Sequence, residues 1–99
     1  MVTIEDIFAV AKSTVAQDWH TVKQRKPFEA RVLGNALMVY PRESRTGKGI
    51  RLGEPPLQRM LDRFNASGSR EVSQYAQDSK NRSYSLTLIL AAFDRNSAG

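Results

Sequence analysis

Four cations recur at intervals of three residues around one polar segment of the chain, Arg42, Arg45, Lys48 and Arg51. Gly47 and Gly49 lie among them and let the backbone approach a ligand closely. On a hairpin loop, guanidinium and ammonium groups can contact a phosphate backbone or reach into a groove. We therefore predict that this loop is the main contact with nucleic acid. The alternative is a solvated loop that binds nothing.

Tyr40 precedes this basic segment and is followed directly by Pro41 and Arg42. An aromatic ring beside a cation can stack on an exposed base. The other interpretation of Tyr40 is a side chain in the core or at its rim, as for the remaining aromatic residues.

A second group of hydrogen-bonding side chains follows Gly68. Two short helices joined by a four-residue turn that contains Gly68 have the proportions of a helix-turn-helix. Arginine pairs with guanine, and glutamine and asparagine pair with adenine. We predict that the second helix and the linker after it contact bases or backbone through Arg70, Gln74, Asn81 and Arg82. Two helices in any small domain can have this spacing, so an ordinary polar surface is the alternative.

The sequence shows no combination of residues that would predict an enzyme active site or a metal site. His20 is the only histidine and there is no cysteine, which excludes an ordinary zinc site. No partnered nucleophile accompanies His20, and the scattered carboxylates do not suggest the metal pair of a nuclease. Gly47-Lys48 is followed by glycine where a phosphate-binding P-loop has Ser or Thr. We predict no catalysis, no metal, no cofactor and no small-molecule substrate.

The positive charge is concentrated in the middle of the chain. The 99 residues carry a formal net charge of +5. Between Lys23 and Arg51 there are eight basic and two acidic residues, a net charge of +6, while the rest of the chain carries −1. A localised basic surface favours polyanionic partners, of which nucleic acid comes first.

The length and the apolar segments predict one small cytoplasmic domain, spanning residues 1–99. Glu5 and Asp6 lie where a signal peptide would be apolar, so we do not expect export. The longest apolar run, 88–93, is far too short to span a membrane. A chain without cysteine has no disulfide framework, which suits a reducing compartment.

The first predicted element is a helix over about residues 3–22. Thr3 followed by Asp6 resembles a capping box, with Asp in place of Glu or Gln. Pro27 ends the segment, because the residue before a proline avoids helical angles. One apolar face with helical spacing contains Ile4, Ile7, Phe8, Ala11, Val15, Trp19 and Val22.

A β-hairpin is predicted next. Residues 28–32 alternate between apolar and charged side chains, the period of a half-buried strand. Gly34-Asn35 supplies a tight turn, and residues 36–40 form the return strand. Both faces of 36–40 are apolar, so we expect this strand to be covered on both sides. A short third strand is predicted at residues 50–52.

The C-terminal half predicts two or three helices. The first starts at Pro55, ends at Gly68 and buries Leu57, Met60, Leu61 and Phe64. Ser69 caps a second, short helix. Residues 84–93 alternate like a strand, but the preceding Ser83 and a continuous apolar end favour a helix. Residues 96–99 are predicted to be a frayed tail.

These elements predict the α+β class: a long N-terminal helix, a two- or three-stranded antiparallel sheet and C-terminal helices. The function predicted is that of a small non-enzymatic DNA-binding protein. Because one small monomer binds DNA weakly, a homodimer is considered. The alternative function is a protein-interaction module, such as an inhibitor or accessory subunit of a nucleic-acid-processing enzyme. In that case the apolar strand 36–40 and the apolar C-terminal element would form the docking surface.

Overall fold

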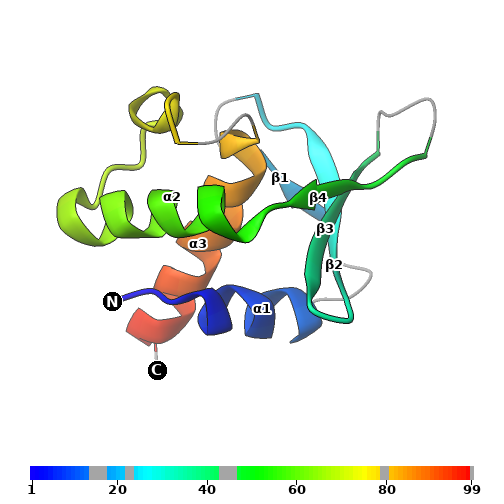
Figure 1. The fold of residues 1–99 in the computed structure, drawn as a ribbon, viewed down its shortest axis with the longest axis horizontal. Helices are drawn as coiled ribbons and strands as arrows, with labels where there is room; N and C mark the ends of the chain where they lie inside the picture. Colours follow the sequence, from blue (N-terminus) through cyan, green and yellow to red (C-terminus); the bar gives the residue numbers. More distant parts are fainter. Residues whose placement is uncertain (14–17, 22–23, 43–46, 79–80, 99) are drawn as a thin grey trace.

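The computed structural model describes residues 1–13, 18–21, 24–42, 47–78 and 81–98. It has the predicted α+β class, with a helix, a four-stranded antiparallel sheet and C-terminal helices (Figure 1). In chain order the elements are α1 (Ile4–Ser13), β1 (Asp18–His20), β2 (Pro27–Leu33), β3 (Ala36–Pro41), β4 (Ile50–Leu52), α2 (Glu54–Ser67), the 3-10 helix η1 (Val72–Tyr75) and α3 (Arg82–Ala98).

Helix α1 begins at the predicted capping box. The backbone N–H of Thr3 donates to Oδ2 of Asp6 at 2.9 Å, and the N–H of Asp6 donates to Oγ1 of Thr3 at 3.2 Å. The first of these bonds, made by the backbone of Thr3, lowers the pKa of Asp6. The aspartate therefore replaces the usual glutamate of a capping box.

Replacing Thr3 with alanine should lower the free energy of unfolding by about 1 kcal/mol, the usual cost of losing an N-cap side chain. Urea unfolding followed by far-ultraviolet circular dichroism measures this change. Thr3→Ser, which keeps the hydroxyl, is the matched control and should lose only a few tenths of a kcal/mol. Equal losses in both variants would show that the hydroxyl does not cap α1.

The predicted helix over 3–22 is wrong for residues 18–20, while residues 14–17 and 22 lie outside the described residues. Residues 18–20 form strand β1 instead, in which Trp19 lies opposite Phe28 of β2. Asp, Trp and His all have modest helix propensity, so the pairing with β2 decides their conformation. Trp19 keeps its apolar environment because it packs against the core from a strand as well as it would from a helix.

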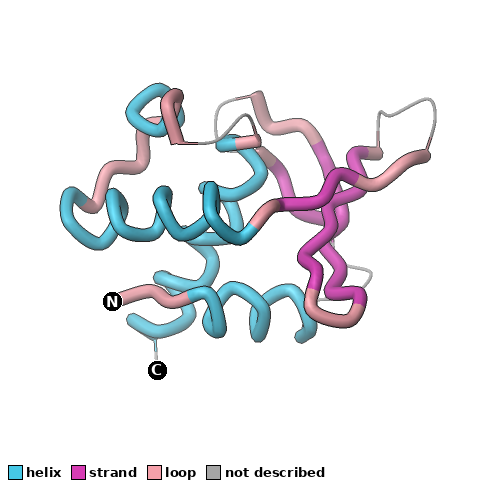
Figure 2. The backbone as a smooth tube through the Cα atoms, in the orientation of Figure 1, coloured by secondary structure: helices cyan, strands magenta, loops and turns pink. Residues whose placement is uncertain are grey.

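The sheet has the strand order β1-β2-β3-β4, so each strand pairs with the next one along the chain (Figure 2). The turn Gly34-Asn35 joins β2 to β3 as predicted, with Leu33 opposite Ala36 and with Gly34 at a φ of +63°. Pairing of β4 with β3 confirms the predicted third strand. The second hairpin therefore brings residue 42 and residues 47–49 to one end of the sheet.

One face of the sheet packs against the helices and contains the core residues Phe28, Ala30, Leu37, Val39 and Leu52. We call the opposite side the outer face; its alternating positions carry Glu29, Arg31, Met38, Tyr40 and Arg51. Within this chain, the cover expected for both sides of 36–40 is found on one side only. Met38 and Tyr40 are only half-buried, because the helices lie against the other face.

Helix α2 is the predicted amphipathic helix. Prolines lie in its first turn, and its buried side chains are the four expected ones, Leu57, Met60, Leu61 and Phe64. Gly68 ends it in the left-handed conformation at a φ of +67°, and its N–H donates to the carbonyl of Phe64 at 2.7 Å. Only glycine adopts this angle without strain, which explains the stop.

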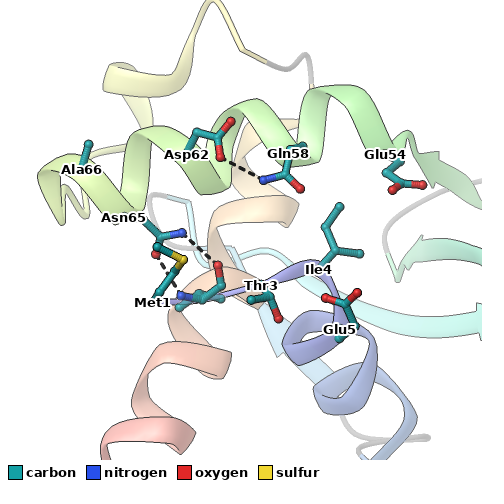
Figure 3. Close-up of a pocket in the computed structure, with 10 residues that line it drawn as sticks. Met1, Thr3, Ile4, Glu5, Glu54, Gln58, Asp62, Asn65 and Ala66 are labelled. Atoms are coloured by element: carbon teal, nitrogen blue, oxygen red, sulfur yellow. Dashed lines mark hydrogen bonds between the residues drawn. The ribbon is translucent and has the colours of Figure 1, made fainter.

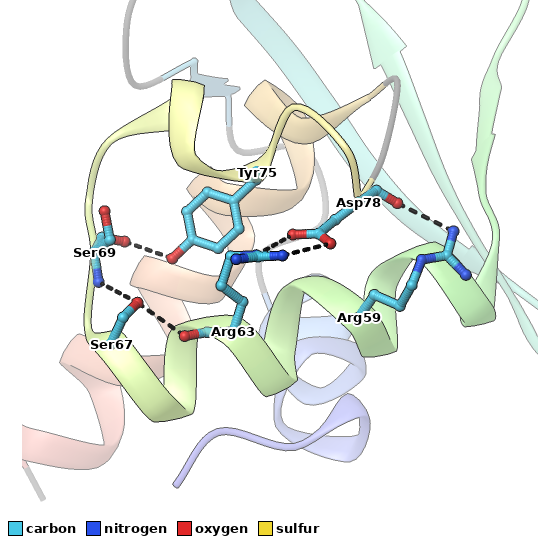
Figure 4. Close-up of polar contacts among 6 residues, drawn as sticks. All are labelled: Arg59, Arg63, Ser67, Ser69, Tyr75 and Asp78. Atoms are coloured by element: carbon cyan, nitrogen blue, oxygen red, sulfur yellow. Dashed lines mark hydrogen bonds and ion pairs between the residues drawn. The ribbon is translucent and has the colours of Figure 1, made fainter.

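The segment after α2 is held onto it by polar contacts (Figure 4). Nε of Arg63 donates to Oδ2 of the buried Asp78 at 2.6 Å, which raises the pKa of Arg63. The hydroxyl of Tyr75, a fully buried side chain, donates to the carbonyl of Ser69 at 2.6 Å. The helix predicted after Ser69 is thus a single 3-10 turn, anchored by Val72 and Tyr75.

Helix α3 confirms the helical interpretation of 84–93 and crosses both α1 and α2 (Figure 1). Five successive residues, 85–89, are buried, so the helix has no polar face to reveal its period. The tail predicted at 96–99 is wrong for residues 96–98, which continue the helix. Nδ2 of Asn96 donates to Oδ2 of Asp6 at 3.3 Å and ties this end to α1. Of the helices described, none has the length and apolar character needed to cross a membrane.

Candidate nucleic-acid interface

Three of the four cations predicted in the basic loop fall within the described residues. Arg42 follows β3, Lys48 precedes β4 and Arg51 lies in β4; all three are exposed. Arg45 lies outside the described residues. Strands β3 and β4 are antiparallel neighbours, so Arg51 lies opposite Met38, whereas Arg42 and Lys48 lie toward the loop end of the same hairpin.

The carboxylate of Glu29 binds two arginines on the outer face. Its Oε1 lies 2.6 Å from Nε of Arg31, and its Oε2 lies 3.3 Å from NH2 of Arg42. The carboxylate is almost fully buried, whereas the arginine side chains remain 52% and 47% exposed. Hydrogen bonding to Glu29 raises the pKa of Arg31. The three groups together carry a net positive charge that stays open to solvent.

Tyr40 lies opposite Glu29 across the β2–β3 ladder. The guanidinium carbon of Arg31 lies 5.7 Å from the centre of the Tyr40 ring, a cation–π contact. Gly49 directly precedes strand β4. A Cβ atom at this position would lie 2.6 Å from Cε1 of Tyr40. Glycine at position 49 therefore allows the ring to lie close to the backbone of the second hairpin.

These side chains form a pocket of about 360 Å³ that we call the hairpin pocket, lined by Glu29, Arg31, Tyr40, Pro41, Arg42 and Gly47. It combines an aromatic ring and a proline with two guanidinium groups. Such a combination suits a flat, partly apolar ligand that carries negative charge nearby.

A second pocket, of about 410 Å³, lies beyond strand β4, and we call it the edge pocket. Its lining residues are Arg51, Gly53, Pro56, Arg59, Ala76, Gln77, Asp78 and Asn81. It brings together two residues predicted separately, Arg51 and Asn81. The sequence prediction missed Arg59, whose NH2 donates to the backbone carbonyl of Asp78 at 3.2 Å.

The remaining predicted residues do not join either pocket. Arg70 lies past the C-terminal end of α2, where NH2 is 3.4 Å from Oδ1 of Asp94 and the guanidinium covers Phe93. Gln74 is exposed on η1, and Arg82 begins α3 with its Nε buried. A four-residue 3-10 turn is too short to serve as the second helix of a helix-turn-helix. Among the described residues, the structure therefore lacks the second helix on which Arg70 and Gln74 were predicted to lie.

Acidic groups gather on a different part of the molecule. The pocket of about 570 Å³ between the N-terminal segment and α2 has Glu5, Glu54 and Asp62 among its lining residues (Figure 3). Asn65 closes it by bonding both backbone groups of Val2, each at 2.9 Å. Among the described residues of the second β-hairpin, none lines this acidic pocket.

His20 lines another pocket, of about 300 Å³, next to Trp19 and Thr87. The single carboxylate that lines it belongs to Asp94, which pairs with Arg70. Within the described part of the chain, no three His, Cys, Asp or Glu side chains come together as a metal site would require.

No family model, no curated protein and no solved structure matches this chain. The two basic pockets and their chemistry are therefore the basis for any functional assignment.

Proposed function

We propose that this protein is a small non-enzymatic DNA-binding protein whose contact surface is the second β-hairpin together with the edge pocket. The observation that supports this most strongly is the position of Arg51. It lies on the outer face opposite Met38 of β3, and Tyr40 is two residues further along that strand. Arg51 also lines the edge pocket. Arg51 therefore links the outer face of the sheet, where the hairpin pocket lies, to the edge pocket.

The cations of the two pockets differ in their local environment. Arg51 makes no ion pair with another described residue and is exposed. Arg31 and Arg42 share Glu29 yet keep about half of their side chains in water. Arg59 adds a cation whose guanidinium is positioned by the carbonyl of Asp78. Contacts of these groups with phosphates would release counterions, which supplies most of the affinity of basic proteins for DNA.

The test is fluorescence anisotropy with labelled DNA from about 50 to 200 mM salt. The logarithm of the association constant should fall linearly with the logarithm of the salt concentration. The double variant Arg42→Ala/Arg51→Ala should bind more weakly, with a slope shallower by about 0.7–0.9 for each lost contact.

Lys12→Ala/Arg95→Ala is the matched control, because it removes the same charge from helices α1 and α3. Its salt slope should equal that of the wild type. Equal slopes for all three proteins would place the contacts elsewhere. Absence of binding at the lowest salt would overturn the proposal and leave the protein-interaction alternative.

A further inference from the structure

The aromatic ring of the hairpin pocket suggests which form of nucleic acid binds. Tyr40 is the aromatic residue on the described outer face; it lines the hairpin pocket together with Arg31 and Arg42, and the guanidinium of Arg31 lies over its ring. An aromatic ring beside cations is the arrangement on which unpaired bases stack. Bases in a duplex are already stacked and paired, so they cannot offer their faces to such a ring.

Resting on the proposed function, we infer that the ligand is single-stranded nucleic acid, with one base held in the hairpin pocket against the pair of Arg31 and Tyr40. The pocket volume of about 360 Å³ lies within the range of sites for small ligands. The base stacks on the guanidinium of Arg31 that lies over Tyr40, beside Pro41. Its neighbouring phosphates meet Arg42 and Lys48, which lie at the same end of the sheet.

The pocket is held in this shape before any ligand binds. Glu29 fixes the guanidinium of Arg31 over the Tyr40 ring, and Gly49 lets that ring lie against the second hairpin. Side chains already ordered lose less conformational entropy when a ligand binds. Because Arg31 covers the Tyr40 ring, the ordered pair offers the outer plane of the guanidinium as the stacking surface, with the ring behind it.

From the hairpin pocket, the bound single-stranded nucleic acid continues along the sheet toward the edge pocket. Gln77 and Asn81 line the edge pocket beside Arg51 and Arg59. Amide side chains can donate to and accept from the Watson–Crick edge of a base that is not paired. The edge pocket thus offers a second position for a base, next to cations that hold the backbone.

The first experiment compares three labelled probes of one sequence of about 16 nucleotides, the upper site size of comparable single-strand binding modules. The probes are single-stranded DNA, single-stranded RNA and the DNA duplex. Both single strands should bind more tightly than the duplex at each salt concentration. Tighter binding of single-stranded RNA than of single-stranded DNA would support the single-strand inference and overturn DNA as the proposed ligand.

Tyr40→Ala should weaken single-strand binding about 5- to 150-fold, the range for the loss of one stacked base. Its salt slope should stay unchanged, because tyrosine carries no charge. Tyr40→Phe keeps the ring and should bind like the wild type. Duplex binding should be nearly unaffected by either variant.

A probe without bases makes the test independent of whether Tyr40→Ala folds. An abasic deoxyribose phosphate chain of the same length keeps the phosphates and lacks the stacking faces. The wild type should bind it more weakly than the single-stranded DNA, by a factor similar to the loss in Tyr40→Ala. Equal binding of abasic and normal strands, or tighter binding of the duplex, would overturn this inference and leave the proposed function intact. No binding to any probe would instead overturn the proposed function.

Discussion

Replacing Tyr75 with alanine will lower the free energy of unfolding by about 3–5 kcal/mol, as for other large aromatic side chains removed from a core. The side chain is fully buried, and its hydroxyl donates to the carbonyl of Ser69 at 2.6 Å. A small domain has only about 5–15 kcal/mol of stability in total, so this loss is a large share of it.

The consequence of this change extends to the edge pocket. Tyr75 ends η1, and the next three residues, Ala76, Gln77 and Asp78, line the edge pocket. We therefore expect Tyr75→Ala to weaken nucleic-acid binding as well as the fold. Urea unfolding followed by the fluorescence of Trp19 measures the stability. A loss below about 1 kcal/mol, the usual net value of a single hydrogen bond, would contradict the packing role of Tyr75.

Tyr75→Phe separates the ring from its hydroxyl and should cost only about 1 kcal/mol. It also tests the effect of pH. Burial raises the pKa of Tyr75 above its ordinary value of 10.0. Between the ordinary and the raised pKa, the unfolded state loses this proton while the folded state keeps it. The stability of the wild type should therefore fall as the pH rises above about 10, and Tyr75→Phe should lack this part of the decline.

The second large effect has the opposite sign: Glu29→Gln should tighten nucleic-acid binding about tenfold, through the stronger positive potential of the outer face. Glu29 now holds both Arg31 and Arg42 with its two carboxylate oxygens. Glutamine keeps one acceptor oxygen, so Arg31 can stay over Tyr40 while Arg42 loses its ion pair with Glu29 and attracts a phosphate more strongly. One added contact should steepen the salt slope by about 0.7–0.9.

Glu5→Gln is the matched control, because it changes the net charge equally from an exposed position on α1. It should alter the affinity far less than Glu29→Gln. Anisotropy titrations across salt measure both variants, and circular dichroism checks that each is folded. Weaker or unchanged binding by a folded Glu29→Gln protein would show that the carboxylate does not restrain Arg42.

The sequence correctly predicted the elements that begin or end at residues with restricted backbone angles. The turn Gly34-Asn35 defines the first hairpin, and the prolines and Gly68 bound helix α2, because these residues restrict the backbone on their own. Helix α1 was predicted too long because Trp19 fits a helical period and a strand equally well. Only its pairing with Phe28 of β2 distinguishes the two structures.

Part of the candidate site could also be predicted from the sequence. A two-residue turn at 34–35 fixes the register, so it places Glu29 opposite Tyr40 and Arg31 opposite Met38. This signal was present in the sequence, and a glutamate within so basic a segment also predicts that Glu29 pairs with arginines, which the structure confirms. The approach of Arg59 to Asp78 and Asn81 depends on how α2 and the segment before α3 pack together, which no local pattern encodes.

The short outer strands of the sheet limit how copies of this protein can associate. Strands β1 and β4 form the two edges, and each contains three residues. Joining two sheets edge to edge would form only a short hydrogen-bonded ladder, which is a common protection against aggregation through exposed strands. A homodimer would therefore have to use side-chain surfaces rather than a continuous sheet. The protein should for the same reason resist fibril formation at high concentration.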